Sequence, residues 1–130
     1  MTAIRRHDHI PGAAFTGGPY AQAVVHGSVV YVAGQIPWNV LTQQPFKGSV
    51  ADETKNIFKN LAVILSACGS SLGHIIRVTA FLSNPNQAKE FSATYNDLFA
   101  AETLPVRTMV FVAALPLGAS IELEVTAATV

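Results

Sequence analysis

The sequence predicts an α+β two-layer sandwich, in which a mixed β-sheet carries two helices on one face. Short stretches of alternating apolar and polar residues indicate strands, and they flank two longer stretches with helical periodicity. Half of the 130 residues are hydrophobic, which is enough for a sizeable core in a single domain over residues 1–130. Strands with helices on one sheet face bury such a core between two layers.

The first third of the chain predicts an arm, a hairpin and a loop. Residues 1–18 are rich in glycine and proline, so we expect an irregular N-terminal arm. Residues 21–25 and 29–32 have the composition of short strands around a turn at residues 26–28. Residues 37–48 are expected to form a long polar loop.

Residues 50–68 have the pattern of an amphipathic helix. Ser49 followed by acidic residues is typical of an N-terminal cap, and Gly69 suits the C-terminal stop. One face of this helix collects Ile57, Leu61, Ile64 and Cys68. Cys68, the only cysteine of the chain, is therefore predicted to be a small buried hydrophobe rather than a nucleophile.

The second half of the chain predicts a strand, a helix and two further strands. We expect the strand at residues 75–82 and the helix at 85–100. The final strands are expected at residues 107–113 and 120–127, which gives the order ββαβαββ. The predicted apolar positions are Ile76, Val78, Ala80 and Leu82 in the first strand, and Ala88, Phe91, Tyr95 and Leu98 in the helix.

Two features favour an oligomer. Charged residues make up 12% of the chain, about half the usual share of ~25%. Residues 108–112 are apolar on both faces of their strand, so neither face is expected to meet water. One face can pack on the helices, and we expect the other to meet a neighbouring subunit.

Charge and composition exclude several classes of protein. Eight basic residues balance eight acidic ones, so no net field draws the chain to nucleic acid. No window approaches the ~20 apolar residues of a membrane-spanning helix. Residues 1–10 lack the apolar core of a signal peptide, and a single cysteine allows no disulfide within one chain. A cytoplasmic protein is the simplest expectation.

Arg107 is the most unusual residue of the predicted strands. It opens an apolar strand and shares a face with Met109 and Phe111. A partly buried guanidinium there needs an anion. Arg107 could form a structural ion pair or snorkel at the edge of the sheet, or it could clamp the carboxylate of a substrate in bidentate fashion.

Glu122 and Glu124 alternate with apolar residues along the last strand. They could simply mark the solvent face of that strand, or one of them could orient or deprotonate a water in a pocket. If the last two strands pair directly, Arg107 lies opposite Thr126, and Glu122 lies opposite Phe111. That offset is about 14 Å along the strand. A pocket between two subunits would relax this constraint.

Tyr20 and Gly34 are further candidates. Tyr20 follows the tight segment Gly17-Gly18-Pro19 and could present its hydroxyl to a cleft, or it could pack in the core or in an interface. Gly34 ends a strand, where a ligand could approach the backbone. The four histidines have no partners at metal-ligand spacing, and no phosphate-binding glycine loop is present. We therefore expect neither a metal nor a cofactor.

Several blocks of the sequence together resemble the RidA/YjgF family of reactive imine and enamine deaminases. The matching blocks, in the family's order, are Gly18-Pro19-Tyr20-Ala21-Gln22-Ala23, Val32-Ala33-Gly34-Gln35-Ile36-Pro37, Pro105-Val106-Arg107, Leu115-Pro116 and Ile121-Glu122-Leu123-Glu124. They extend over nearly the whole chain, and the run from Pro105 to Glu124 is the strongest.

The resemblance implies a chorismate-mutase-like fold and a homotrimer with ligand sites in the clefts between subunits. Arg107 would hold the carboxylate of an imino acid, and Glu122 would position the attacking water. Tyr20 and backbone groups near Gly34 would line the pocket. The implied reaction is hydrolysis of 2-imino or enamino acids, such as 2-aminoacrylate/2-iminopropanoate, to 2-oxo acids and ammonia, without a metal or cofactor.

The chain departs from the typical deaminating members at three expected pocket positions. Ala33 stands where those members have serine, Ser92 where they have asparagine, and Met109 where they have cysteine. We therefore count Ser92 and Met109 among the substrate-binding residues and expect an altered preference, for a bulkier or more apolar imine.

Other functions stay open at this point. The main alternative is a non-catalytic trimer that binds small carboxylates as a sensor or partner module, since Arg107 alone would support it. A ribonuclease, attached to some relatives, is disfavoured because phosphate contacts need a Lys/Arg-rich face. A chaperone-like role has also been attached to relatives.

Overall fold

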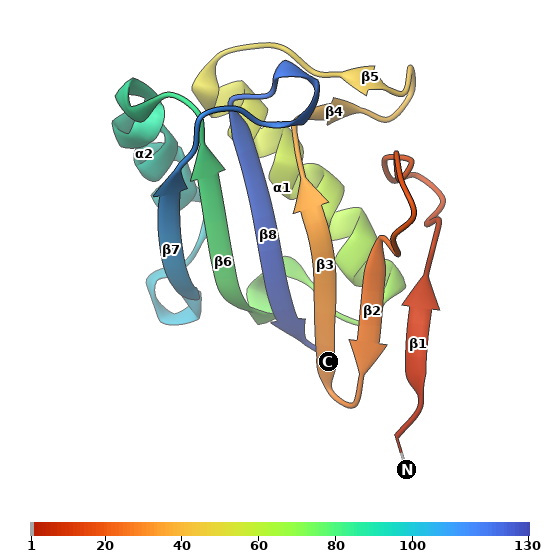
Figure 1. The fold of residues 1–130 in the computed structure, drawn as a ribbon. Coiled ribbons are helices and arrows are strands. Elements are labelled where there is room, and N and C mark those ends of the chain that lie inside the picture. Colours follow the sequence, from red (N-terminus) through yellow and green to blue (C-terminus); the bar gives the residue numbers. More distant parts are fainter. Residues whose placement is uncertain (1) are drawn as a thin grey trace.

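The computed structural model describes residues 2–130 and shows a six-stranded sheet with two helices on one face (Figure 1). The strand order is β1-β2-β3-β8-β6-β7. All neighbouring strands are antiparallel except β6 and β7, which run parallel. The predicted α+β two-layer sandwich with a mixed sheet is therefore confirmed.

The elements follow the predicted order, with additional short strands and 3-10 turns. The sheet consists of β1 (Ile4–His7), β2 (Ala23–His26), β3 (Val29–Gln35), β6 (Ile75–Leu82), β7 (Val106–Phe111) and β8 (Ile121–Ala128). The covering helices are α1 (Val50–Ala67) and α2 (Ala88–Leu98). Outside the sheet lie the short strands β4 (Trp38–Asn39) and β5 (Gln44–Pro45) and the single 3-10 turns η1 (Leu72–His74), η2 (Pro85–Gln87), η3 (Ala101–Thr103) and η4 (Pro116–Gly118).

Helix α1 begins and ends as the sequence predicts. The Ser49 hydroxyl accepts a hydrogen bond from the Asp52 N–H at 3.0 Å, which satisfies one of the free donors of the first turn. Gly69 adopts φ 75°, a left-handed conformation that ends the helix without strain. Cys68 is 4% exposed in the core between helix and sheet, so its predicted burial is confirmed.

Two predicted apolar positions are wrong, and each error has a local cause. Ile76 is 48% exposed because the register of β6 against β8 shifts between Ile75 and Arg77, so Ile75 fills the core instead. Leu98 is 37% exposed at the end of α2. Phe99 packs against the core in its place, with its ring centroid 4.8 Å from that of Tyr95.

The predicted helix over residues 85–100 is shorter than expected. Residues 85–87 form the 3-10 turn η2, and the α-helix itself begins only at Ala88. Asn84 caps the turn η2, since its side chain accepts from the Asn86 N–H at 3.0 Å.

The N-terminal arm is less irregular than predicted. Residues 4–7 form the edge strand β1, which pairs antiparallel with β2; Met1 lies outside the described residues. The side chains of β1 are mostly exposed, so the sequence of this strand shows no apolar alternation. The loop prediction for residues 37–48 also needs correction, since β4 and β5 pair within it as a hairpin too short to leave a periodic pattern.

The expected pairing of the last two strands is wrong. Strand β6 lies between β7 and β8, so Arg107 is beside Val78 rather than Thr126, and Glu122 is beside Phe81 rather than Phe111. The physical reason is burial. Every second residue of β8 is fully buried, as befits a central strand, whereas β7 is largely exposed and lies at the edge.

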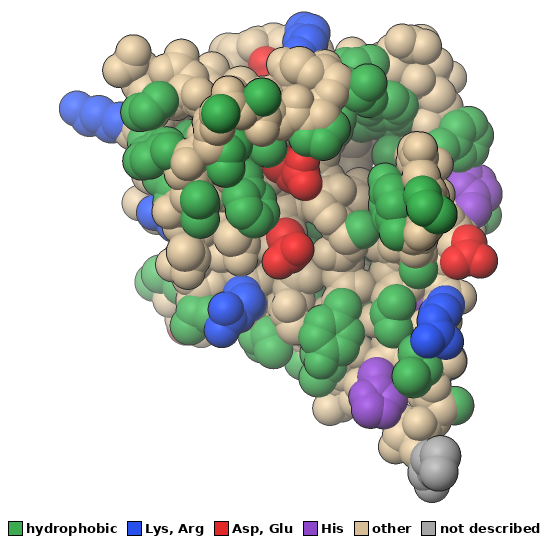
Figure 2. Space-filling model, viewed as in Figure 1, with side chains coloured by type: hydrophobic (Ala, Val, Ile, Leu, Met, Phe, Trp, Pro, Cys, Tyr) green, Lys and Arg blue, Asp and Glu red, His purple; other side chains and the backbone are tan. Residues whose placement is uncertain are grey.

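One face of the sheet is free of helices; we call it the open face, and it carries Tyr31, Val110, Glu122 and Glu124. Figure 2 shows acidic side chains beside a hollow on this face, among hydrophobic side chains. Tyr31 is 51% and Val110 36% exposed. That a neighbouring subunit covers this face stays a prediction. Within residues 2–130, none of the helices has the length and apolar character needed to cross a membrane.

Candidate active site

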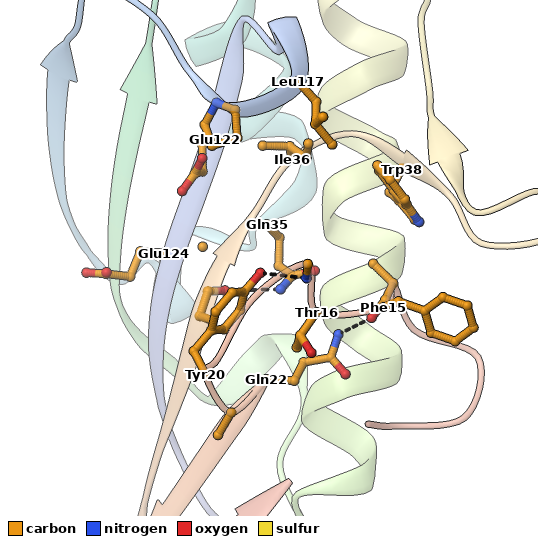
Figure 3. Close-up of a pocket in the computed structure, with 16 residues that line it drawn as sticks. Phe15, Thr16, Tyr20, Gln22, Gln35, Ile36, Trp38, Leu117, Glu122 and Glu124 are labelled. Atoms are coloured by element: carbon orange, nitrogen blue, oxygen red, sulfur yellow. Dashed lines mark hydrogen bonds between the residues drawn. The ribbon is translucent and has the colours of Figure 1, made fainter. Parts of the chain in front are cut away.

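A pocket of about 730 Å³ opens beside β3 and β8 (Figure 3). Its walls come from the N-terminal arm, from the end of β3 with the segment that follows, and from η4 with the start of β8. The lining residues are Ala14, Phe15, Thr16, Gly17, Tyr20, Ala21, Gln22, Ala33, Gly34, Gln35, Ile36, Trp38, Pro116, Leu117, Glu122 and Glu124.

Glu122 lies against the backbone of Gly34. The pairing of β3 with β8 is irregular between Val32 and Gln35, and Gly34 lies in this bulge. A Cβ atom at Gly34 would overlap the Glu122 carboxylate and come within 3.0 Å of its Cδ. Glycine at position 34 therefore makes room for the carboxyl group in the pocket.

The pocket changes the acidity of Glu122. Partial burial raises the pKa of its carboxyl above the ordinary value, and the nearby Glu124 raises it further. A carboxylate with a raised pKa is a better proton acceptor than one in water. Glu122 can thus act as a general base on a water held in the pocket.

Tyr20 and the arm are held in place around Gln22. The Gln22 side chain, 1% exposed, accepts from the Ile10 N–H at 3.2 Å and donates to the Ala14 carbonyl at 2.7 Å. Tyr20 is half-exposed, and its hydroxyl accepts from the Gly17 N–H at 3.3 Å (Figure 3). Tyr20 therefore lies at the pocket wall, and its hydroxyl is bonded to the arm.

A second glutamine, Gln43, ties the arm to Trp38. Its side-chain oxygen accepts from the Phe15 N–H at 3.1 Å and from the Trp38 indole N–H at 2.9 Å. The Trp38 backbone is held from the other side, since its N–H donates to Asn56 at 2.7 Å and its carbonyl accepts from Asn60 at 2.9 Å. The indole is thus fixed in orientation at the pocket wall.

Arg107 lies elsewhere, at the edge of the sheet under α2. Its guanidinium stacks on the Tyr95 ring at 4.8 Å and lies 5.9 Å from the Phe91 centroid. Within residues 2–130 its one side-chain acceptor is the Ser92 hydroxyl, at 3.4 Å. Met109, two residues further along β7, packs partly buried against the core. The guanidinium has donors left for an anion.

One chain places the predicted site residues in two separate groups. Tyr20, Gly34 and Glu122 meet at the pocket on the open face. Ser92, Arg107 and Met109 gather at the β7 edge on the helix-covered face, as the register of Arg107 with buried Val78 shows. No lysine or arginine is among the described residues that line the pocket. Within one chain, Arg107 and Glu122 therefore cannot hold the same small ligand.

Sequence reasoning missed several residues of the site. Gln22 lies in one of the sequence blocks that resemble the family, but nothing in the pattern indicates that its side chain anchors the arm. Gln43 lies in the predicted polar loop, and no sequence signal marks its φ of 53°. Trp38 offered the best signal, since it is the only tryptophan of the chain and follows a strand end closely.

Comparison with known proteins identifies the family. The sequence model described as Endoribonuclease L-PSP matches residues 12–129. The chain belongs to this family, the RidA/YjgF family. Its RidA/YjgF relatives include a RutC family protein of Pyrococcus horikoshii, which is 37% identical over 110 residues, or 85% of this chain and 86% of the relative.

Two further RidA/YjgF relatives bear on function and fold. The human 2-iminobutanoate/2-iminopropanoate deaminase is 36% identical over 117 residues, or 90% of this chain and 82% of the human protein. The crystal structure of E. coli TdcF with bound serine superposes with a TM-score of 0.87 at 31% identity, covering 97% of this chain and 100% of that one. The fold implied by the resemblance is confirmed.

Proposed function

We propose that this protein hydrolyses 2-imino acids and their enamine tautomers to 2-oxo acids and ammonia. The observation that carries this proposal is the Glu122 carboxyl, which lies in the pocket against Gly34 with a raised pKa. A human relative named 2-iminobutanoate/2-iminopropanoate deaminase, which is 36% identical over 90% of this chain, supports the proposal.

The chemistry needs little beyond a placed water. Water attacks the imine carbon of the iminium form, and Glu122 takes a proton from that water. The resulting tetrahedral amino alcohol receives this proton on nitrogen. The carbon–nitrogen bond then breaks and ammonia leaves. The hydroxyl proton passes to ammonia, so the products are the 2-oxo acid and ammonium. One water is consumed and no electrons change hands, so no redox cofactor is required.

The substrate carboxylate requires a cation that the pocket of one chain does not supply. The pocket contributes Glu122 and Glu124, and their negative charges would repel an anionic substrate. Arg107 has free donors and no carboxylate of its own among the contacts described above. We assign Arg107 the role of the carboxylate clamp, with Ser92 and Met109 beside it.

The two groups of residues require an assembly. If Arg107 of one subunit reaches the pocket of the next, each site gains both a cation and a base. We propose a homotrimer, in which three such contacts close a ring around the open faces. The exposed apolar side chains of Tyr31 and Val110 would then be covered.

The test is stopped-flow loss of 2-imino acids generated in situ by an amino-acid oxidase. Wild type should accelerate the loss. The variant Glu122→Gln should lose at least about 100-fold in turnover, because removing a general base costs about 10²–10⁴-fold, and it should still bind 2-oxo acids. Arg107→Ala should lose both turnover and binding while its circular dichroism is unchanged.

The alternative function is a carboxylate-binding module without catalysis. Such a module needs Arg107 but makes no use of a base at position 122. The two functions differ in one result: if wild type binds 2-oxo acids and accelerates the loss of no imino acid, the hydrolase proposal is wrong.

A further inference from the structure

One end of the pocket is apolar. Ile36, Trp38 and Leu117 form what we call the apolar end. In Figure 3 the Glu122 carboxyl lies across from Trp38, with Ile36 and Leu117 between them. A ligand whose reacting carbon lies at Glu122 and whose carboxylate is held by Arg107 could direct its side chain toward the apolar end. Ala33 adds a methyl group to the wall rather than a hydrogen-bonding group.

Leu117 holds its position at a conformational cost. It adopts φ 55° and ψ 29°, the left-handed region that a leucine rarely enters. Its side chain is 67% exposed, so burial in this chain's core does not explain the residue. The Lys47 ammonium donates to the Gly118 carbonyl at 3.2 Å and fixes the turn from outside the pocket. Strain of this kind is typical of functional sites.

Trp38 is equally fixed. Its indole N–H is already bonded to Gln43, and its backbone is held by Asn56 and Asn60. The ring therefore has no hydrogen bond to offer a ligand and presents apolar surface only. A rigid aromatic surface of this kind binds side chains at little cost in entropy.

The pocket is also large for a small imino acid. A volume of about 730 Å³ lies within the roughly 300–1,000 Å³ of pockets that hold drug-sized ligands. A neighbouring subunit that brings Arg107 to the pocket would occupy part of this volume. The walls at Ile36, Trp38 and Leu117 belong to this chain, and an imino acid with a methyl side chain would leave this apolar end in contact with water. A branched aliphatic or aromatic side chain would displace that water from apolar surface.

We infer that the pocket selects 2-imino acids with a large apolar side chain, branched aliphatic or aromatic, and that Ile36, Trp38 and Leu117 determine this preference. The inference rests on the proposed hydrolysis and specifies its substrate class. Leu117 is the residue to test, because glycine adopts its backbone conformation without strain.

The single tryptophan allows binding to be measured apart from turnover. Trp38 is the only tryptophan of the chain, so its fluorescence reports a ligand at the apolar end directly. Wild type is titrated with 4-methyl-2-oxopentanoate and with pyruvate, which are the products expected from a large and a small imino acid. The Kd for the larger acid should be lower by about tenfold or more, since one extra methylene in an apolar pocket is worth about 10–200-fold.

Kinetics with the two corresponding imino acids complete the test. Wild type should prefer the isobutyl side chain over the methyl side chain about tenfold or more in kcat/KM. Leu117→Gly should lower this ratio at least threefold. The matched control is Leu41→Gly, which removes a leucine that is 93% exposed in the turn between β4 and β5 and does not line the pocket; it should leave the ratio unchanged.

The outcomes separate the inference from the proposed function. Equal or weaker binding and turnover of the larger ligands would overturn the inference and leave the hydrolase intact. An unchanged ratio in Leu117→Gly would overturn the role of the apolar end. Tighter binding of the larger acid with no hydrolysis of any imino acid would instead contradict the proposed function.

Discussion

At the scale of single residues, the proposed function depends most on the carboxyl group of Glu122. Its carboxyl is partly removed from water and lies near a second carboxyl, and both effects favour the protonated form. The proposed base must be ionised to accept a proton. Its raised pKa therefore shifts the acid limb of the activity profile to higher pH than the pKa of an ordinary glutamate would give.

The pH profile tests this directly. As pH falls through the raised pKa of Glu122, kcat/KM should fall with it. Glu124→Gln removes the nearby negative charge, lowers the pKa of Glu122, and should shift the acid limb to lower pH. The exposed Glu90→Gln in α2 serves as the control and should leave the limb in place. An acid limb that stays fixed in Glu124→Gln would contradict the assignment of Glu122 as the titrating base.

Gly34 provides a second test at this scale. In Gly34→Ala the new Cβ would occupy the position of the Glu122 carboxylate and displace it. We expect turnover to fall about 10- to 100-fold, as for a catalytic group misplaced by about 1 Å. The matched control is Gly73→Ala in η1, whose Cβ would meet only the Ser71 hydroxyl at 3.9 Å. Full activity in Gly34→Ala would show that the position of the carboxyl against Gly34 does not matter.

Residue identities at the site could be predicted from sequence only where a motif marks them. Tyr20, Gly34 and Glu122 were singled out, and the fold brings them to one pocket. The roles of Gln22, Gln43 and Trp38 depend on hydrogen bonds that span 5 to 28 residues of sequence. No local pattern encodes such contacts, so only the structure could show them.

At the scale of elements, the part of the N-terminal arm that follows β1 builds one side of the pocket and is tied to β1. Gln22 links them, because its side chain bonds Ile10 and Ala14 while its N–H donates to the His7 carbonyl at 2.8 Å. Removal of the side-chain amide would leave two backbone groups without partners, one of them in a buried segment.

Gln22→Leu should therefore lower the free energy of unfolding by about 2–4 kcal/mol. It should also speed hydrogen exchange in residues 8–20, and binding of 2-oxo acids should weaken because the arm lines the pocket. Gln44→Leu, an exposed glutamine in β5, is the control. Stability within error of wild type in Gln22→Leu would show that the arm is anchored by other contacts.

The elements themselves were predicted with mixed success for physical reasons. Helix α1 and strand β6 show strong periodicity over many residues, so their bounds were close. Strand β1 is held by backbone hydrogen bonds with mostly exposed side chains, and β4–β5 pairs only two residues a side, so neither leaves a pattern. The composition of a strand does not determine which strand it pairs with, so the pairing of β7 with β6 could not be predicted.

At the scale of the whole molecule, the proposed function makes one chain an incomplete site. The base and its pocket lie on the open face, whereas the guanidinium stacks on Tyr95 under α2. The low fraction of charged residues and the exposed apolar side chains both favour burial of this surface between subunits. The central claim is that neighbouring subunits complete each other's sites.

Mixing two inactive variants tests that claim most directly. Arg107→Ala and Glu122→Gln are each purified, shown by sedimentation to be trimers, then dissociated together and reassembled in equal amounts. If Arg107 of one subunit serves the pocket of the next, random mixing leaves both residues intact at about one quarter of the sites. The account predicts recovery of about a quarter of wild-type turnover. No recovery in a verified mixed trimer would contradict it, because sites built within single chains cannot complement each other.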